Sequence, residues 1–197
     1  VLDNIHIRGE DIHAMEPVEI GVSGANLEGE HLWWEIERHY DVDGYMGFYS
    51  REPKIVFPKE GRYTVTCNNE YQANRYGTVP HHAIRKLNVL VLPPKASEDN
   101  KRPVVNLSYD KEADHGSNVI VDARESYDPD GELTRYFALF ANGQTKEGEI
   151  NDEMDLVFQP KIDDYIANTI PGEYNFYIVL YDDKGASGMA SGQILEK

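Results

Sequence analysis

The feature that most constrains this chain is a series of short runs of β-branched and aromatic residues, separated by turn-forming residues. Gly, Pro, Asn and Asp interrupt the runs about every 8–12 residues, the spacing typical of β-sandwiches and β-barrels. No long window keeps a helical period of apolar residues, and residues 152–158 are ambiguous between helix and strand. We therefore predict an all-β protein, with strands at residues 16–23, 32–36, 61–67, 85–92, 103–108, 118–123, 133–140 and 172–181.

A Pro-rich polar segment divides the chain near its middle. Leu92 is followed by Pro93 and Pro94, and then mostly by polar residues up to Pro103. Prolines fix φ and remove backbone donors, and the polar residues offer little to bury, so this segment is predicted to be a linker. The parts on either side, residues 1–95 and 96–197, each have the length of a common domain and carry net charges of −4 and −12.

Composition excludes several classes of protein. The 197 residues are 40% hydrophobic, which is enough to bury a core, and their formal net charge is −16. This charge argues against an electrostatic grip on nucleic acid or anionic lipid and favours cations or a basic partner. No apolar run approaches the roughly 20 residues that span a bilayer, so we expect no membrane insertion. The single cysteine excludes an internal disulfide. Because the chain starts with Val1, we expect a mature product or a piece of a longer protein.

Two motifs in the second half carry a resemblance to a known family. Residues 121–136 read VDARESYDPDGELTRY, and residues 171–187 read PGEYNFYIVLYDDKGAS. Their order and spacing resemble the PKD (polycystic kidney disease) domain, an immunoglobulin-like β-sandwich. Residues 137–143 depart from the family, which usually has a tryptophan and an acidic tight turn there. In the first half, residues 58–66 resemble the second motif, and residues 68–83 are an insertion. The resemblance implies two tandem immunoglobulin-like sandwiches of the PKD type.

Acidic turns near the linker are candidates for a calcium site. Carboxylates two residues apart before a glycine can present oxygen atoms to Ca²⁺, and the resemblance implies calcium close to the linker in some members. The alternative is an Asx-type turn, in which each Asp accepts hydrogen bonds from the backbone. The same choice applies to the turn of Asp41 and Asp43, where a hairpin is sufficient. The predicted calcium ligands are Asp128, Asp130, Asp182, Asp183 and Asn100.

Adjacent tryptophans suggest a binding surface in the first half. Neighbouring residues of a strand point to opposite faces, so one of Trp33 and Trp34 is expected in the core and the other in solvent. With Tyr45 and Tyr49 close in sequence, the outward ring would form an aromatic patch for a protein or a carbohydrate. The alternative is that the tyrosines only line a loop.

The sequence indicates no enzyme. There is no Gly-x-Ser-x-Gly elbow and no Gly-rich phosphate loop, and Cys67 lies in a predicted strand. His81 and His82 are adjacent, a spacing that chelates one metal poorly.

Two functions remain. The first is a non-catalytic module that acts as a rigid spacer, adhesive or decoration rod. It would lie outside the cell, on the cell surface or on a virion exterior. Its partners would be a protein or carbohydrate surface, further domains of a longer chain, or a viral capsid or tail. The alternative is an accessory, substrate-engaging region of a larger secreted hydrolase, which a catalytic motif in the parent chain would support.

Overall fold

The computed structural model describes residues 2–24, 32–39, 46–50, 53–69, 83–95, 99–141, 143–162 and 173–197. These residues form fifteen β-strands and one 3-10 helix, so the predicted all-β class is confirmed. Each half is built from two packed sheets, the architecture of immunoglobulin-like sandwiches. The described residues do not include the turn of Asp41 and Asp43, nor Tyr45, nor the pair of His81 and His82.

The first half contains a three-stranded and a four-stranded antiparallel sheet. The strand order is β1–β2–β5 in one sheet and β4–β3–β6–β7 in the other. The strands are β1 (Leu2–Ile7), β2 (Pro17–Gly24), β3 (Leu32–Arg38), β4 (Met46–Tyr49), β5 (Lys54–Val56), β6 (Gly61–Asn69) and β7 (Ala83–Val91). Alternate residues of β6 (Tyr63, Val65 and Cys67) enter the core between the sheets, as the period of two predicts.

The second half contains a three-stranded and a five-stranded sheet. Their orders are β13–β10–β8 and β12–β11–β14–β15–β9, and only β9 runs parallel to its described neighbour. The elements are β8 (Ser108–Tyr109), β9 (Glu112–Ala113), β10 (Val121–Asp122), β11 (Leu133–Phe140), β12 (Thr145–Glu149), η2 (Glu153–Leu156), β13 (Val157–Phe158), β14 (Glu173–Asp182) and β15 (Ser187–Glu196).

Three segments differ from the predicted strands. Residues 118–123 were expected to form a strand, but only Val121–Asp122 does so, and Asn118 forms an isolated bridge to Lys161. Residues 103–108 were expected to form a strand, but Val104 only bridges Tyr127 and regular pairing begins at Ser108. Residues 152–158 begin with a 3-10 turn because Asp152 and Asp155 form a capping box. A short strand follows only at Val157. All described pairings stay within one half, so the sheets separate between Leu92 and Val104, and the boundary at residue 95 stays a prediction.

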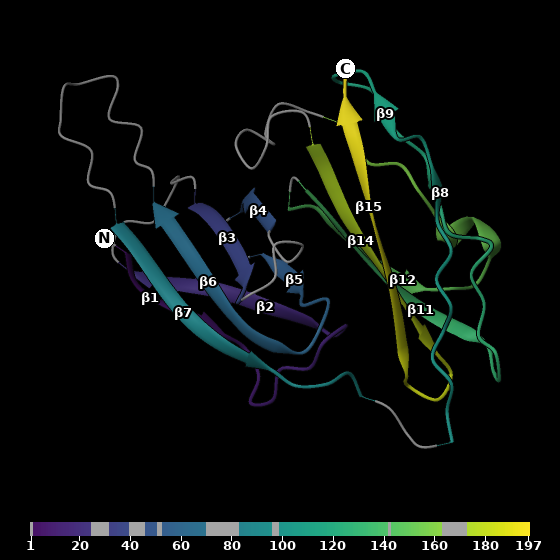
Figure 1. The fold of residues 1–197 in the computed structure, drawn as a ribbon, viewed down its shortest axis with the longest axis horizontal. Coiled ribbons are helices and arrows are strands. Elements are labelled where there is room, and N and C mark those ends of the chain that lie inside the picture. Colours follow the sequence, from purple (N-terminus) through teal and green to yellow (C-terminus); the bar gives the residue numbers. More distant parts are fainter. Residues whose placement is uncertain are drawn as a thin grey trace.

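The five-stranded sheet is buried on both faces. In β14, residues 176–182 are all buried, and in β11, residues 136–140 are all buried. One face packs into the core of the second sandwich, whereas Phe137, Leu139, Tyr177, Val179 and Tyr181 join the apolar cluster of the first half. The two halves therefore lie side by side with the sheet of β11, β14 and β15 between them (Figure 1). The predicted rod would place the two sandwiches end to end, and this arrangement is wrong, because the first sandwich covers this apolar face of the sheet.

Candidate functional site

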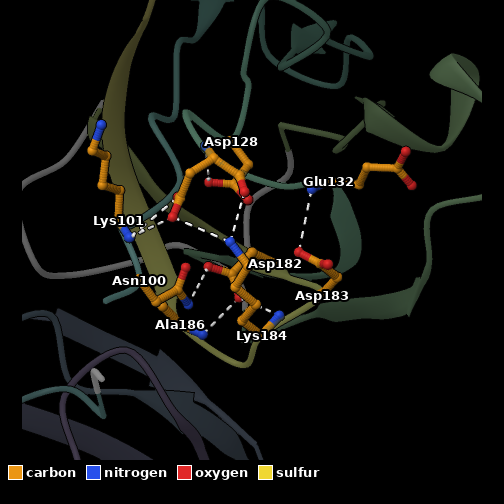
Figure 2. A network of polar contacts seen from close by, with 9 residues as sticks. Asn100, Lys101, Asp128, Glu132, Asp182, Asp183, Lys184 and Ala186 are labelled. Atoms are coloured by element: carbon orange, nitrogen blue, oxygen red, sulfur yellow. Dashed lines mark hydrogen bonds and ion pairs between the residues drawn. The ribbon is translucent and has the colours of Figure 1, made fainter. Parts of the chain in front are cut away.

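The five predicted calcium ligands meet beside the linker. The turn of Asp128 and Asp130 faces the hairpin that joins β14 to β15, and linker residues Asn100 and Lys101 pass next to both (Figure 2). The residues that the sequence grouped therefore lie close together, and their role as calcium ligands stays a prediction. Their hydrogen bonds show what each carboxylate does.

Asp182 holds the β14–β15 turn and ties it to the linker. Asp182 is only 4% exposed. Oδ1 accepts hydrogen bonds from the backbone N–H groups of Lys184 (2.9 Å) and Ala186 (2.8 Å), and Oδ2 accepts one from Asn100 Nδ2 (2.9 Å). A carboxylate that accepts three hydrogen bonds is satisfied without a metal, so Asp182 behaves as an Asx-type anchor.

Asp130 is paired with a cation of the chain itself. Lys184 Nζ lies 2.6 Å from the Asp130 carbonyl oxygen and 3.2 Å from Oδ2. The backbone N–H of Lys101 donates to Asp130 Oδ1 at 3.2 Å. Burial alone would raise the pKa of Asp130, but the bonds from Lys184 and Lys101 outweigh it and lower the pKa, while Asp130 raises the pKa of Lys184. Lys184 was not among the predicted site residues, although it follows Asp182 and Asp183 directly in the sequence.

Within the part of the chain that the structure describes, Asp128 and Asn100 each have one side-chain oxygen without a hydrogen-bond partner. Asp128 Oδ2 and Asn100 Oδ1 are buried and accept no hydrogen bond from the described residues. Burial, and then the charges of Asp130 and Asp182, raise the pKa of Asp128. Gly131 leaves the space into which Asp128 and Asp183 point, since a Cβ there would collide with both carboxylates. Asp183 also accepts a hydrogen bond from the Glu132 N–H at 3.3 Å.

The oxygen atoms of this site therefore suit a hard cation, but they do not form a complete coordination shell. Within the described ranges, no three carboxylate, imidazole or thiol groups gather closely enough to hold a metal. Calcium takes six to eight oxygen ligands, so it would need the free oxygens of Asn100 and Asp128 together with carbonyl groups or water. It would also compete with the Lys184 ammonium for Asp130.

The predicted aromatic patch is not formed by the tryptophans. Trp33 is 7% exposed and Trp34 is 0% exposed, so the expectation that one ring faces solvent is wrong. Leu32, Trp33 and Trp34 are consecutive buried residues, which means that β3 is covered on both faces at this end. Each indole is also satisfied, Trp34 by the Ser50 carbonyl and Trp33 by Glu35, both at 2.9 Å. Tyr49 pairs with Trp33 through the backbone of β4.

A contact between the halves was not predicted. The Tyr181 hydroxyl donates to the carbonyl oxygen of Met15 at 3.1 Å, and Arg102 reaches the Met15 sulfur at 3.8 Å. Met15 has a φ of 61°, a left-handed conformation that costs energy for a residue with a side chain. Lys54 adds an ion pair with Glu147, 2.6 Å from Oε1. The signal in the sequence was the pair of unbroken apolar runs in β11 and β14, which are typical of sheets covered on both faces.

Comparison with known proteins gives structural similarities only. No family model matches the chain, and no curated protein matches it. Similar solved structures include the PKD1 domain of Epp from Vibrio anguillarum, with 26% identity over 50% of this chain and 98% of that chain, at a TM-score of 0.37. The fibronectin(III)-like modules of CbhA from Clostridium thermocellum share 17% identity over 98% of this chain and 94% of theirs, at a TM-score of 0.35.

A third similar structure concerns promiscuous carbohydrate-binding modules of the β-sandwich superfamily. It shares 23% identity over 50% of this chain and 36% of that chain, at a TM-score of 0.39. The solved structures thus include a PKD domain, the family that the second-half motifs resemble. Among the described residues, no helix has the length and apolar character to cross a membrane.

Proposed function

We propose that this chain is a non-catalytic module that holds two immunoglobulin-like sandwiches as one rigid block on a secreted, cell-surface or virion-exterior protein. The observation that carries the proposal is the five-stranded sheet, which is buried by both halves at once. A sheet covered on both faces cannot rotate away from either neighbour without exposing apolar area, at about 25 cal/mol per Å². Surfaces of the two sandwiches are then presented to a protein or carbohydrate partner in one fixed orientation.

The strong acidity of the chain suits this role. A net charge of −16 keeps a surface module soluble and repels polyanions. An accessory role in a secreted hydrolase remains an alternative that the resemblance suggests, and no contact in the described residues favours it over a spacer or adhesive role.

Solution scattering of a Leu139→Asp variant tests the rigid block. Leu139 is 0% exposed, yet it lies on the face of β11 that the first half covers. A carboxylate at this position should therefore separate the halves and leave each sandwich folded, with a larger radius of gyration and unchanged circular dichroism. Leu90→Asp adds the same charge at a side chain that is 63% exposed, so it serves as the matched control. A compact Leu139→Asp variant, or an already extended parent protein, would refute the proposal.

We further propose that Ca²⁺ binds beside the linker and stabilises the folded chain. The free oxygens of Asn100 and Asp128 support this, together with the space at Gly131. Asp130, Asp182 and Asp183 would complete the site. Thermal unfolding with about 1 mM CaCl₂ and with EDTA measures the effect, since this is the range of extracellular calcium sites.

The expected result is a midpoint several degrees higher in calcium. Lys184→Met should enlarge the difference, because the methionine keeps the side-chain length and removes the competing ammonium. Lys197→Met, which removes a charge that pairs with Glu112, is the control. If the midpoint is the same in calcium and EDTA for the parent chain and for Lys184→Met, the acidic turns are only turns.

A further inference from the structure

Strand β7 leaves one edge of the four-stranded sheet open. It is the last strand in the order β4–β3–β6–β7, and it lies on the side of the first half that is turned away from the second half (Figure 1). Among the described residues, β6 is the strand that pairs with β7, and β1 of the opposite sheet approaches β7 but forms its ladder with β2. The free backbone groups of such an edge can pair with the strand of another chain.

Four residues of β7 direct their backbone groups to this open edge. The N–H of Leu92, directly after β7, donates to the Ile12 carbonyl at 2.7 Å, and its carbonyl accepts from the N–H of Ala14 at 2.9 Å. Leu92 therefore faces away from β6. The N–H and C=O of a strand residue point to one side, and the side alternates from residue to residue. The residues in phase with Leu92 are Ile84, Lys86, Asn88 and Leu90.

The side chains of these four residues are exposed, and their pattern is symmetric about Leu87. Ile84 and Leu90, each three residues from Leu87, are 51% and 63% exposed. Lys86 and Asn88 lie one residue from it on either side. Suppose that a second copy of β7 runs antiparallel to the first, with the two Leu87 residues opposite each other. Each Ile84 then faces Leu90 of the second copy across the ladder, and each Lys86 faces Asn88 of the second copy. Apolar cross-strand pairs of this kind stabilise a sheet.

The charge of β7 and the register both favour a second copy. Residues 83–92 carry two basic and no acidic side chains, in a chain with a net charge of −16, so this segment lacks the acidic groups through which copies of the chain repel each other. A lysine on an edge strand opposes pairing when it meets another charge of the same sign. The two neighbouring registers that use the same backbone groups set Lys86 opposite Lys86, or Lys86 opposite Leu90. The symmetric register avoids both pairs.

We propose that two copies of this chain pair through β7, with Leu87 on the two-fold axis. The four-stranded sheets of the two copies then continue into one sheet, and the second sandwiches lie at its two ends. The same patch serves both copies, as in other two-fold interfaces. Pairing through one strand gives a small interface, so we expect a dissociation constant between about 10 µM and 1 mM. This inference goes beyond the module proposed above and does not depend on its rigidity.

Sedimentation velocity of the full chain, between about 5 µM and 2 mM, measures the association. Leu90→Asp should weaken the dimer by about 10-fold or more, because it removes an apolar pair at both ends of the ladder. Leu195→Asp makes the same change at a leucine of β15 that is 43% exposed, so it is the matched control and should leave the dimer intact.

Asn88→Asp tests the register. It places a carboxylate opposite Lys86 of the second copy at two symmetric positions, so the dimer should tighten by about 2- to 30-fold, although the chain becomes more acidic. Amide hydrogen exchange, followed by nuclear magnetic resonance, tests the location. The N–H groups of Lys86 and Asn88 point to the open edge, so their exchange should slow as the protein concentration rises.

Four results would overturn the assignment. They are a monomer at every concentration, an equal loss in Leu195→Asp, a weaker dimer in Asn88→Asp, or a dimer in which the exchange of Lys86 and Asn88 does not slow. A monomer in which these two N–H groups exchange slowly would also overturn it, and would assign the edge to another segment of the chain. The scattering of Leu139→Asp is read at concentrations where one copy is present, so the test of the rigid block stays separate.

Discussion

Replacing Tyr181 with Phe removes one hydrogen bond between the halves and keeps nearly all of the packing. The hydroxyl donates to the Met15 carbonyl at 3.1 Å, and Tyr181 is buried. The ring also lies 4.7 Å from the guanidinium of Arg135, a contact that phenylalanine retains. The substitution therefore isolates the bond that helps to hold Met15 in its left-handed conformation.

The expected loss follows from the state of the two partners. A net contribution of about 1 kcal/mol is usual for one hydrogen bond, and leaving a partly buried acceptor without a donor raises the cost to about 1–2 kcal/mol. With an m-value of about 2 kcal/mol/M in urea, the midpoint of unfolding should fall by about 0.5–1 M. The same loss should appear in both halves, because the contact joins them.

The two tryptophans make the assay specific. Trp33 and Trp34 are the only tryptophans, so their fluorescence reports unfolding of the first half, whereas circular dichroism reports both. We expect the two midpoints to coincide and to fall together in Tyr181→Phe, although the substitution lies in the second half.

Tyr177→Phe is the matched control for this experiment. Tyr177 lies on the same face of β14, and its hydroxyl has no hydrogen bond to the described residues. A change in the free energy of unfolding below about 0.3 kcal/mol would refute the reasoning, because errors of that size are ordinary. An equal change in Tyr177→Phe, or an unchanged midpoint of tryptophan fluorescence in Tyr181→Phe, would refute it as well.

Three further predictions concern other parts of the molecule. Gly188→Ala should lower the free energy of unfolding by about 2–4 kcal/mol, because a Cβ at position 188 would collide with the Pro103 carbonyl group. Urea unfolding measures this loss, with Ser191→Ala as the control, and an unchanged stability of Gly188→Ala would contradict it. Cys67 is buried, and burial raises the pKa of its thiol to about 12, so Cys67 should resist a thiol reagent at pH 8 in the native protein. In urea it should react at the rate at which the protein unfolds, and rapid modification of the native protein would contradict this. Burial also raises the pKa of Tyr181, so as the pH rises this phenol loses its proton in the unfolded chain before it does so in the folded protein. The free energy of unfolding should therefore fall above a pH of about 10, and it should fall less in Tyr181→Phe. Equal losses of stability at alkaline pH in both proteins would contradict this.

The strands that the sequence predicted well are those with a strong local pattern. β11 and β14 are long aromatic and β-branched runs, so their bounds agree with the prediction within one residue. β12 reads TKEGE and β15 is rich in small polar residues, so neither shows apolar alternation. They form because the neighbouring strands supply hydrogen-bond partners, which is a tertiary effect.

The candidate site shows the same limit. The acidic residues could be grouped because two motifs lie in a fixed order, and a sandwich brings their turns to one end. The hydrogen bonds to Asp182 and the contact between the Lys184 ammonium and Asp130 depend on distances in the folded protein. The spacing of residues along the chain does not define these distances. The burial of both tryptophans likewise depends on what covers β3, because alternation along a strand only says that they face opposite ways.

The linker connects these observations. Asn100 is bonded to Asp182, the N–H of Lys101 to Asp130, and Arg102 to the Pro94 carbonyl and the Met15 sulfur. Each of these residues therefore has a partner in a folded element, and Arg102 contacts the first half directly. A segment that is held at successive residues loses the conformational entropy that a short polar segment would otherwise have. This entropy is already lost when the two halves pack, so a ligand that binds afterwards does not add the same cost. A cation at Asn100 and Asp128 would consequently act on a linker that is already ordered. Its main effect should be on the unfolding midpoint, with little change in the shape of the molecule.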